Sequence, residues 1–282
     1  YTDQVTSMFA LFYNCKSLGT IDVSKFKTSK VTTMDAMFYN CTVVSNITGL
    51  NNLDTSKVTN MNSMFANCKG LTTIDISNFD TSNVEQMAYM FMSASKLQSI
   101  TFPRQMNTSK LTTIIEIFAG CESLLNLDLN NWNTANVTDM SNAFWNCKAL
   151  TEIKLESWNT EKVTNMRHMF RGCEKLTSID LSGWKTPNVN SFDSMLSDCT
   201  QLKVVDCREF IIKEGANVAA IFHGCTSITN LNISKMDFSK VGTWGYAFYN
   251  VPINAKITTN KATKSWLQTV YKENFTNIET ID

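Results

Sequence analysis

The chain has 282 residues, 43% of them hydrophobic and 18% charged, which is the composition of a globular protein with ample length to bury a core. Its 25 lysines and arginines balance 25 aspartates and glutamates. That balance argues against nucleic-acid binding, because nucleic-acid binders usually carry a basic excess. No stretch approaches the roughly 18 consecutive apolar residues of a membrane-spanning helix, so we expect no membrane insertion by this chain.

An internal repeat organises the sequence, and its marker is a phenylalanine followed three residues later by a cysteine. The pairs are Phe12/Cys15, Phe38/Cys41, Phe65/Cys68, Phe118/Cys121, Phe144/Cys147, Phe170/Cys173 and Phe222/Cys225. Leu196 replaces the phenylalanine in one unit, and Ala94 and Val251 replace the cysteine in two others. The marker recurs every 26 residues, or 27 in two places, which predicts ten units over residues 1–257. The first unit starts inside the repeat, so we expect a fragment of a longer protein.

Each unit opens with a helical pattern. Val31, Met34, Phe38 and Cys41 are spaced i, i+3, i+7 and i+10, which predicts one buried face of a short helix. A threonine such as Thr28 stands before this face, where its side chain would cap the first amides of the helix.

A short strand is expected after each cysteine. The pattern Leu71, Ile74, Ile76 alternates in its second half, as strands do, and a large apolar residue such as Trp158 anchors the return loop. One unit cannot bury its own apolar face, so neighbouring units must stack. The predicted fold is therefore an α/β repeat solenoid: a leucine-rich-repeat-like right-handed stack of about ten 26-residue helix–strand units, with a parallel sheet on one face.

The pattern stops after Pro252. Residues 263–271 then read as an amphipathic helix that would cover the open end of the stack. We predict a solenoid domain over 1–257 and a C-terminal cap over 258–282.

The unit at 58–82, with its Val-Thr-Asn-Met and Met-Phe-x-x-Cys segments, resembles the BspA-like leucine-rich repeats of bacterial and mycoplasmal surface proteins. The resemblance extends from residue 1 to about 257 and is weak at 86–106 and 206–225. It implies an extracellular protein anchored to the cell surface, whose repeats bind host or microbial partners. It implies no catalytic residues.

The sequence favours no enzyme chemistry. Eight of the nine cysteines occupy one repeat position on the buried face, where reduced thiols act as small apolar groups, and Cys207 takes a strand core position. No cysteine pair has the short spacing of a metal site. His168 and His223 are isolated, and there is no phosphate-binding loop or nucleophile elbow. We expect no catalytic residues, no metal and no cofactor.

The outward strand positions form the first candidate binding surface. They carry six acids against one lysine, a net of −5: Asp22, Asp75, Asp128, Glu152, Asp180 and Asp206, with Lys154. Lysines gather elsewhere, just before the predicted helices: Lys30, Lys57, Lys110, Lys162 and Lys240. One hypothesis is an acidic face that binds a basic protein, or a cation such as calcium. The alternative is that each aspartate serves the turn after its strand.

A second candidate surface is the residue after each core phenylalanine, which varies between units while the core does not. Its large members are Tyr13, Tyr39, Trp145, Arg171, His223 and Tyr249. Aromatic residues and arginine are common interface anchors. The alternative is partial burial of these side chains against the neighbouring unit.

Taken together, these patterns predict a non-enzymatic adhesion or ligand-binding module that recognises a host or microbial surface protein or glycoprotein. A structural spacer that displays another domain is the alternative. A third possibility, ice binding, rests on the threonines that recur once per unit: Thr28, Thr55, Thr81, Thr108, Thr134, Thr160 and Thr186.

Overall fold

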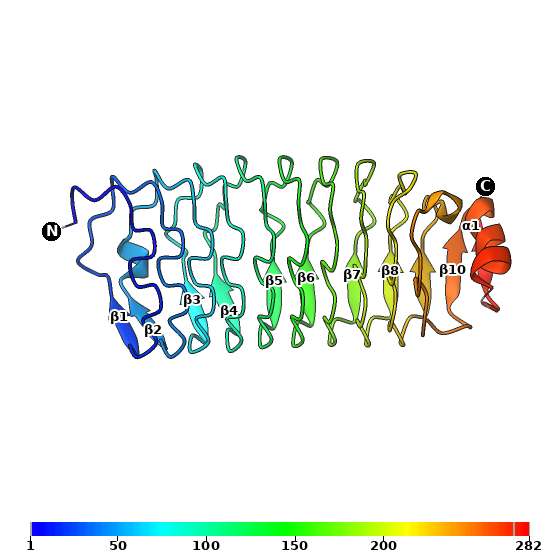
Figure 1. Ribbon diagram of the computed structural model, residues 1–282, viewed down its shortest axis with the longest axis horizontal. Coiled ribbons are helices and arrows are strands. Elements are labelled where there is room, and N and C mark those ends of the chain that lie inside the picture. The colour runs from blue at the N-terminus through cyan, green and yellow to red at the C-terminus, as the bar shows by residue number, and fades with distance from the viewer. Residues whose placement is uncertain (1, 273, 282) are drawn as a thin grey trace.

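The computed structural model describes residues 2–272 and 274–281, and these form a parallel β-solenoid of about nine turns. Successive units lie side by side along a rod, with the first unit at one end and the only α-helix of the described residues at the other (Figure 1). The predicted repeat solenoid with a parallel sheet is confirmed, whereas the count of ten units is not.

Short strands line one side of the rod. The first nine have three residues each: β1 Thr20–Asp22, β2 Asn46–Thr48, β3 Thr73–Asp75, β4 Ser99–Thr101, β5 Asn126–Asp128, β6 Glu152–Lys154, β7 Ser178–Asp180, β8 Val204–Asp206 and β9 Asn230–Asn232. The strands pair in parallel and in register, as Ile21 with Ile47. Ladder pairing is interrupted between β2 and β3, between β4 and β5, and between β6 and β7. The repeat has its extra residue at the first two of these places. After β2, the 3-10 turn η1 (Leu50–Asn52) accommodates that residue.

The helices predicted within the repeat units are wrong. Each predicted helix is instead a row of consecutive turns, and helix makes up only 6% of the structure. In the second unit the N–H groups of Met37, Tyr39 and Cys41 donate to carbonyls three residues earlier in the chain. The N–H groups between them, those of Phe38 and Asn40, donate to the third unit instead. The repeating unit is therefore turn–strand.

Left-handed backbone explains why no helix forms. Two residues of the turn segment have positive φ, as at Ala36 (54°) and Asn40 (61°). An α-helix needs right-handed dihedrals throughout, and a left-handed residue at every fourth position ends it. The residue before the cysteine signals this in the sequence, because asparagine and glycine tolerate positive φ best. It is Asn14, Asn40, Asn67, Gly120, Asn146, Gly172, Asp198 or Gly224.

Stacked phenylalanines form the centre of one continuous core. From Phe12 to Phe170, neighbouring rings lie 5.2 to 5.6 Å apart between centroids and nearly parallel. Trp158 and Trp184 stack at 6.0 Å in the return loops. Burying one such side chain contributes about 1.5–3 kcal/mol, so the stack stabilises the contacts between units.

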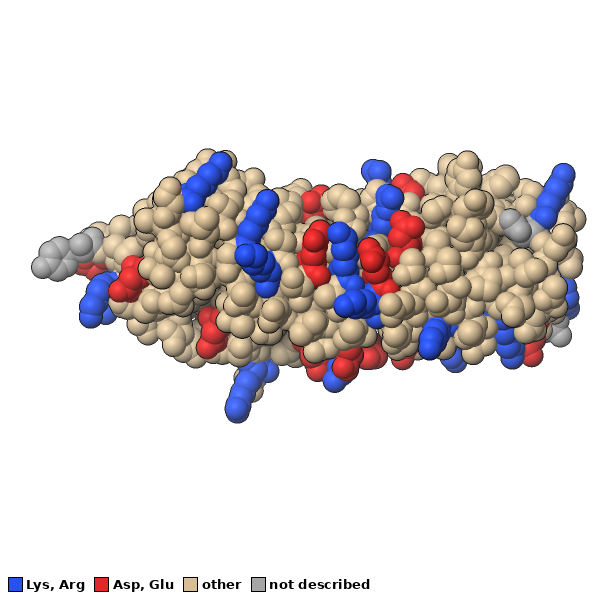
Figure 2. All heavy atoms as spheres, turned by 90° about the horizontal axis from the view of Figure 1, so that it is seen from below, with Lys and Arg blue, Asp and Glu red and all other residues tan. Residues whose placement is uncertain are grey.

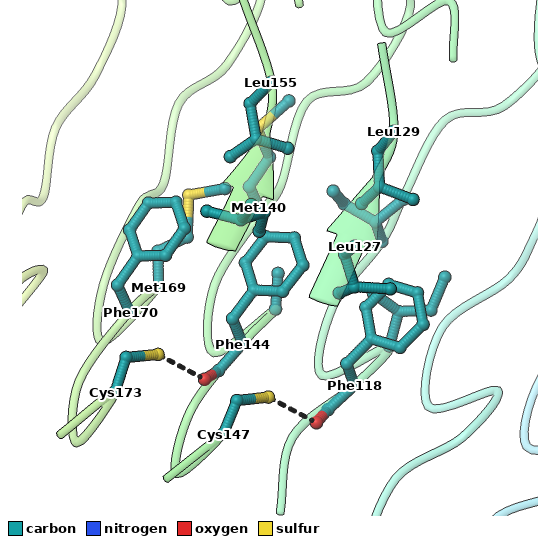
Figure 3. Close-up of a cluster of buried hydrophobic side chains, with 14 of the residues drawn as sticks. Phe118, Leu127, Leu129, Met140, Phe144, Cys147, Leu155, Met169, Phe170 and Cys173 are labelled. Atoms are coloured by element: carbon teal, nitrogen blue, oxygen red, sulfur yellow. Dashed lines mark hydrogen bonds between the residues drawn. The ribbon is translucent and has the colours of Figure 1, made fainter. Parts of the chain in front are cut away.

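The cysteines form a hydrogen-bonded ladder beside the phenylalanines. Cys147 donates its thiol to the carbonyl of Phe118, and Cys173 does the same to Phe144, both at 3.2 Å (Figure 3). Five more cysteines repeat the contact at 3.1 Å. Burial raises the pKa of Cys41 to about 11 and that of Cys121 to about 12, which disfavours the reactive thiolate.

The recurring threonines are buried, which corrects two predictions. Thr55, for example, donates its hydroxyl to the carbonyl of Asp80 in the next unit at 2.9 Å. Thr108, Thr134 and Thr160 make the equivalent bond. These side chains therefore link neighbouring units rather than cap helices, and they form no exposed threonine array for ice.

The C-terminal end is covered by α1 (Lys261–Trp266), which continues as the π-helical turn η3 (Leu267–Tyr271) and matches the helix expected over 263–271. The strands β10 (Lys256–Thr259) and β11 (Ile278–Thr280) extend the sheet beyond β9. The Tyr271 hydroxyl accepts the N–H of Phe248 at 2.9 Å. The domain division at 257/258 stays a prediction.

Replacing Asn67, whose φ is 59°, tests whether the left-handed residues before the cysteines constrain the fold. We expect Asn67→Ala to lower the free energy of unfolding by about 1 kcal/mol, because alanine is strained in this region. The matched variant Asn67→Gly should stay within about 0.5 kcal/mol of the parent, since glycine is unstrained there. Urea denaturation followed by circular dichroism measures both, and equal losses would show that φ is not the constraint.

Thiol labelling tests the cysteine ladder. Cys15 is partly exposed, while the other eight cysteines are buried. At about pH 8 we expect a disulfide-exchange reagent to modify Cys15 first and the rest only on unfolding, as measured by mass spectrometry of proteolytic peptides. The same reaction in concentrated guanidinium chloride is the control. Rapid labelling of the buried thiols in the folded protein would contradict the ladder.

Candidate binding surface

The turn segments project one variable row of side chains, which we call the turn ridge. It consists of the residue after each core phenylalanine or its equivalent: Tyr13, Tyr39, Ala66, Met92, Ala119, Trp145, Arg171, Ser197, His223 and Tyr249. The neighbouring positions are held by backbone bonds to the next unit, as Phe144 is to Met169 and Asn146 to Arg171. The large side chains of the ridge are exposed or half-buried, as the second predicted surface requires.

The rings of the turn ridge differ in their contacts. Tyr13 and Tyr39 stack at 4.9 Å, and His223 stacks on Tyr249 at 5.4 Å. Neighbouring units thus cover part of these rings, as the alternative interpretation expected. Trp145 is 39% exposed. Among the described residues it alone of these five rings has no aromatic partner, so no neighbouring ring covers its face.

A hollow of about 410 Å³ lies beside Trp145. Ser93, Ser95, Ala119 and Gly120 contribute small side chains or none to its lining. Lysine or glutamate occupies the position of Ser95 in several other units, as at Lys69 and Glu122. The hollow exists because the fourth and fifth units carry small residues where others carry large ones.

Charged side chains also line the hollow. Glu122 and Lys69 belong to the same row of the repeat, two units apart, and Glu122 pairs with Lys148 at 3.0 Å. Glu116 accepts a hydrogen bond from Asn142 at 3.4 Å, and its partial burial raises the pKa of its carboxyl group. Viewed from below, charges of both signs lie next to one another near the middle of the molecule, and a wide area toward the C-terminal end carries neither (Figure 2).

Further polar contacts run along the turn segments toward the C-terminus. Arg171 pairs with Asp198 at 3.6 Å, and the ring of His223 lies 3.5 Å from the same carboxylate. His168 contacts Asn142 at 3.1 Å, and burial together with the nearby Arg167 lowers the pKa of its imidazole. Both histidines therefore have neighbours within the turns, but no three His, Cys, Asp or Glu side chains of the described residues converge as metal ligands.

The acidic strand row is exposed, as expected, but its carboxylates are engaged locally. Asp22, Asp75 and Asp180 each accept the N–H of a serine two residues later, at 2.8 to 3.0 Å. These serine bonds lower the pKa of each carboxyl group. Asp128 and Asp206 make the same turn with Asn130 and Arg208. This geometry supports the alternative in which the aspartates serve the turn after the strand.

Basic side chains neutralise part of the same row. Lys154 lies 3.5 Å from Asp128 and 3.6 Å from Glu152, and Arg208 pairs with Asp206. The predicted lysine row is exposed on another side, where Lys110 and Lys162 donate to Asn83 and Asn136 of the preceding units. These ion pairs leave the acidic strand row with less negative charge to attract a basic partner than its composition suggests.

Most residues of the hollow were not predicted as site residues from the sequence. Of its lining residues only Trp145 was a predicted site residue, whereas Glu116, Glu122 and Lys69 were not. The available signal was the weak repeat at 86–106, where Phe91-Met92-Ser93-Ala94-Ser95 interrupts the usual pattern. An irregular unit marks a position where the surface departs from the repeat.

The comparisons with known proteins agree with the repeat. The family model described as "Mycoplasma protein of unknown function, DUF285" matches residues 6–125, 42–153 and 138–261, and the predicted resemblance to BspA-like leucine-rich repeats is confirmed. Among curated proteins, none matches.

Two solved structures are similar at low identity. A leucine-rich repeat protein from Bacteroides ovatus is 16% identical, with 97% of this chain and 86% of that chain covered and a TM-score of 0.35. A leucine rich cell surface protein from Faecalibacterium prausnitzii is 20% identical, with 99% and 78% covered and a TM-score of 0.40. No helix among residues 2–272 and 274–281 is long and apolar enough to cross a membrane.

The strand-end aspartates predict a pH dependence. Their pKa values are lower in the folded than in the unfolded chain, so their stabilisation is present above the unfolded pKa of about 3.9 and is lost as pH falls through the lowered folded values. The triple variant Asp22→Asn, Asp75→Asn, Asp180→Asn should melt at a lower temperature than the parent at neutral pH. The difference should vanish at acid pH.

Thermal melts by circular dichroism across the acid range measure this effect. Glu214→Gln, which removes an exposed carboxylate outside the strand row, is the control and should leave the profile unchanged. A triple variant that stays as stable as the parent at every pH would mean that the serine bonds contribute nothing to folding.

Proposed function

This chain belongs to the Mycoplasma family of unknown function DUF285, and from that premise we propose that it is a non-enzymatic binding module that recognises a host or microbial protein or glycoprotein at the cell surface. The observation that carries the proposal is the hollow beside Trp145 on the turn ridge. An open aromatic face next to a hollow with both charge types is typical of interface anchors.

The distribution of variation along the rod supports this proposal. The phenylalanine and cysteine columns are nearly constant because each side chain must match the same side chain of the next unit. The turn ridge varies from tyrosine to alanine, tryptophan and arginine. Packing does not require such variation, whereas selective recognition of a partner does.

The strand row is the less favoured surface for binding. Its carboxylates already accept turn amides, and Lys154 and Arg208 pair with three of them. The strand side does have a hollow of about 510 Å³, but Asp128 is its only charged lining residue among those described.

A binding screen with point variants tests the proposal. We expect the chain to bind at least one member of an immobilised panel of purified matrix and mucosal glycoproteins, and Trp145→Ala to weaken that binding roughly tenfold, the effect of losing an interface anchor. Tyr246→Ala removes an exposed ring that is not part of the turn ridge and is the control. Binding that Trp145→Ala leaves intact would overturn the assignment of this site.

Whole-unit deletions separate binding from a spacer role. Gln86 and Asp139 occupy the same repeat position, as do Asn165 and Asn217, so removing 86–138 or 165–216 keeps the register. The first deletion removes most of the hollow and should abolish binding. The second leaves the hollow in place and should preserve it. A spacer would tolerate both.

A further inference from the structure

We propose that the hollow beside Trp145 receives an arginine side chain from a protein partner, with the guanidinium group against the Trp145 indole and the carboxylates of Glu116 and Glu122 as acceptors. This inference rests on the proposed binding function and names the chemistry of its site.

The size of the hollow points to a single side chain. At about 410 Å³ it lies near the small end of the range for ligand pockets. Its extent along the rod is set by the units at its ends, which carry Lys69 on one side and Trp145 on the other. An extended segment of a partner would need a groove running across more units.

The lining chemistry selects a cation. Glu116 is the one carboxylate of the lining without an ion pair among the described residues, because Glu122 already pairs with Lys148 at 3.0 Å. Lys69 belongs to the third unit, Glu116 to the fifth and Trp145 to the sixth. A cationic ligand is therefore attracted to the Glu116 carboxylate and repelled from the Lys69 end.

The open indole favours arginine. A guanidinium group is planar, stacks on an aromatic face and can donate to two carboxylates at once. The Trp145 ring is 39% exposed and has no aromatic partner among the described residues, unlike Tyr39 and His223. Glu116 is partly desolvated, which strengthens its attraction for a cation that replaces water.

The irregular unit at 86–106 creates this selectivity for a cation. Ser95 takes a place that Lys69 and Lys148 occupy in their units. A lysine at 95 would fill the hollow and place a positive charge beside Glu122. The variant Ser95→Lys restores the regular pattern, so it is expected to fold normally while losing arginine binding.

A titration with short blocked peptides tests the inference directly. The probes are acetyl-Gly-Arg-Gly-amide, its citrulline analogue, which keeps the shape without the charge, and acetyl-Gly-Glu-Gly-amide. The readout is the indole N–H resonance of Trp145 in the ¹⁵N-labelled chain, assigned with Trp145→Phe. We expect a saturable shift with the arginine peptide and none with the other two.

Variants then locate the contacts. Glu116→Gln and Glu122→Gln should each weaken the arginine peptide by roughly tenfold, and Ser95→Lys should abolish the shift. Glu174→Gln, which neutralises the same row two units beyond Glu122, should change nothing. Circular dichroism confirms that each variant is folded.

Three results would overturn the inference: no shift at Trp145 up to millimolar arginine peptide, an equal shift with the citrulline peptide, or a shift with the glutamate peptide. If any of these occurs while Trp145→Ala still abolishes binding to a glycoprotein of the panel, the proposed function stands and only the arginine assignment fails. Loss of both shows that the hollow is not a binding site.

Discussion

In the turn segments of the first nine units, alternate backbone N–H groups donate to carbonyls of the next unit, while the N–H groups between them close turns within their own unit. Each peptide group thereby finds a partner without a helix or a long strand, which a buried backbone requires. The bonds hold neighbouring units at a fixed spacing, so every side chain must stack on the same position of the next unit. The phenylalanine spine, the thiol ladder and the buried threonines all follow from this constraint.

The sequence contained enough to predict which side chains are buried but not the path of the backbone between them. Val31, Met34, Phe38 and Cys41 are all buried, as expected. Their spacing is equally that of turns with a left-handed residue at every fourth position, so periodicity alone could not separate these turns from a helix. The residue before each cysteine carried the deciding information, because asparagine or glycine at one fixed place is typical of positive φ. The strands were predictable because they alternate in the ordinary way.

The binding surface was only partly predictable for a different reason. Trp145 could be identified because it varies beside a constant phenylalanine. The hollow beside it depends on what is missing, namely the larger side chains that other units place where Ser93 and Ser95 stand. A gap of this kind is formed jointly by four neighbouring units, and single-residue patterns do not reveal it. The same reasoning explains the strand row, where the charges of the acids were visible in the sequence but their turn contacts were not.

The one-way bonding of the turns also gives the rod a polarity. In the turn segments the alternate N–H groups point toward the C-terminal end of the rod, whereas other N–H groups, such as those of Thr59 and Ser45, donate to the preceding unit. At the C-terminal end, the Tyr271 hydroxyl accepts the N–H of Phe248. A turn segment that lengthens the rod at its N-terminal end must therefore bring donors, and one at its C-terminal end must bring acceptors. The two ends of the rod are not interchangeable.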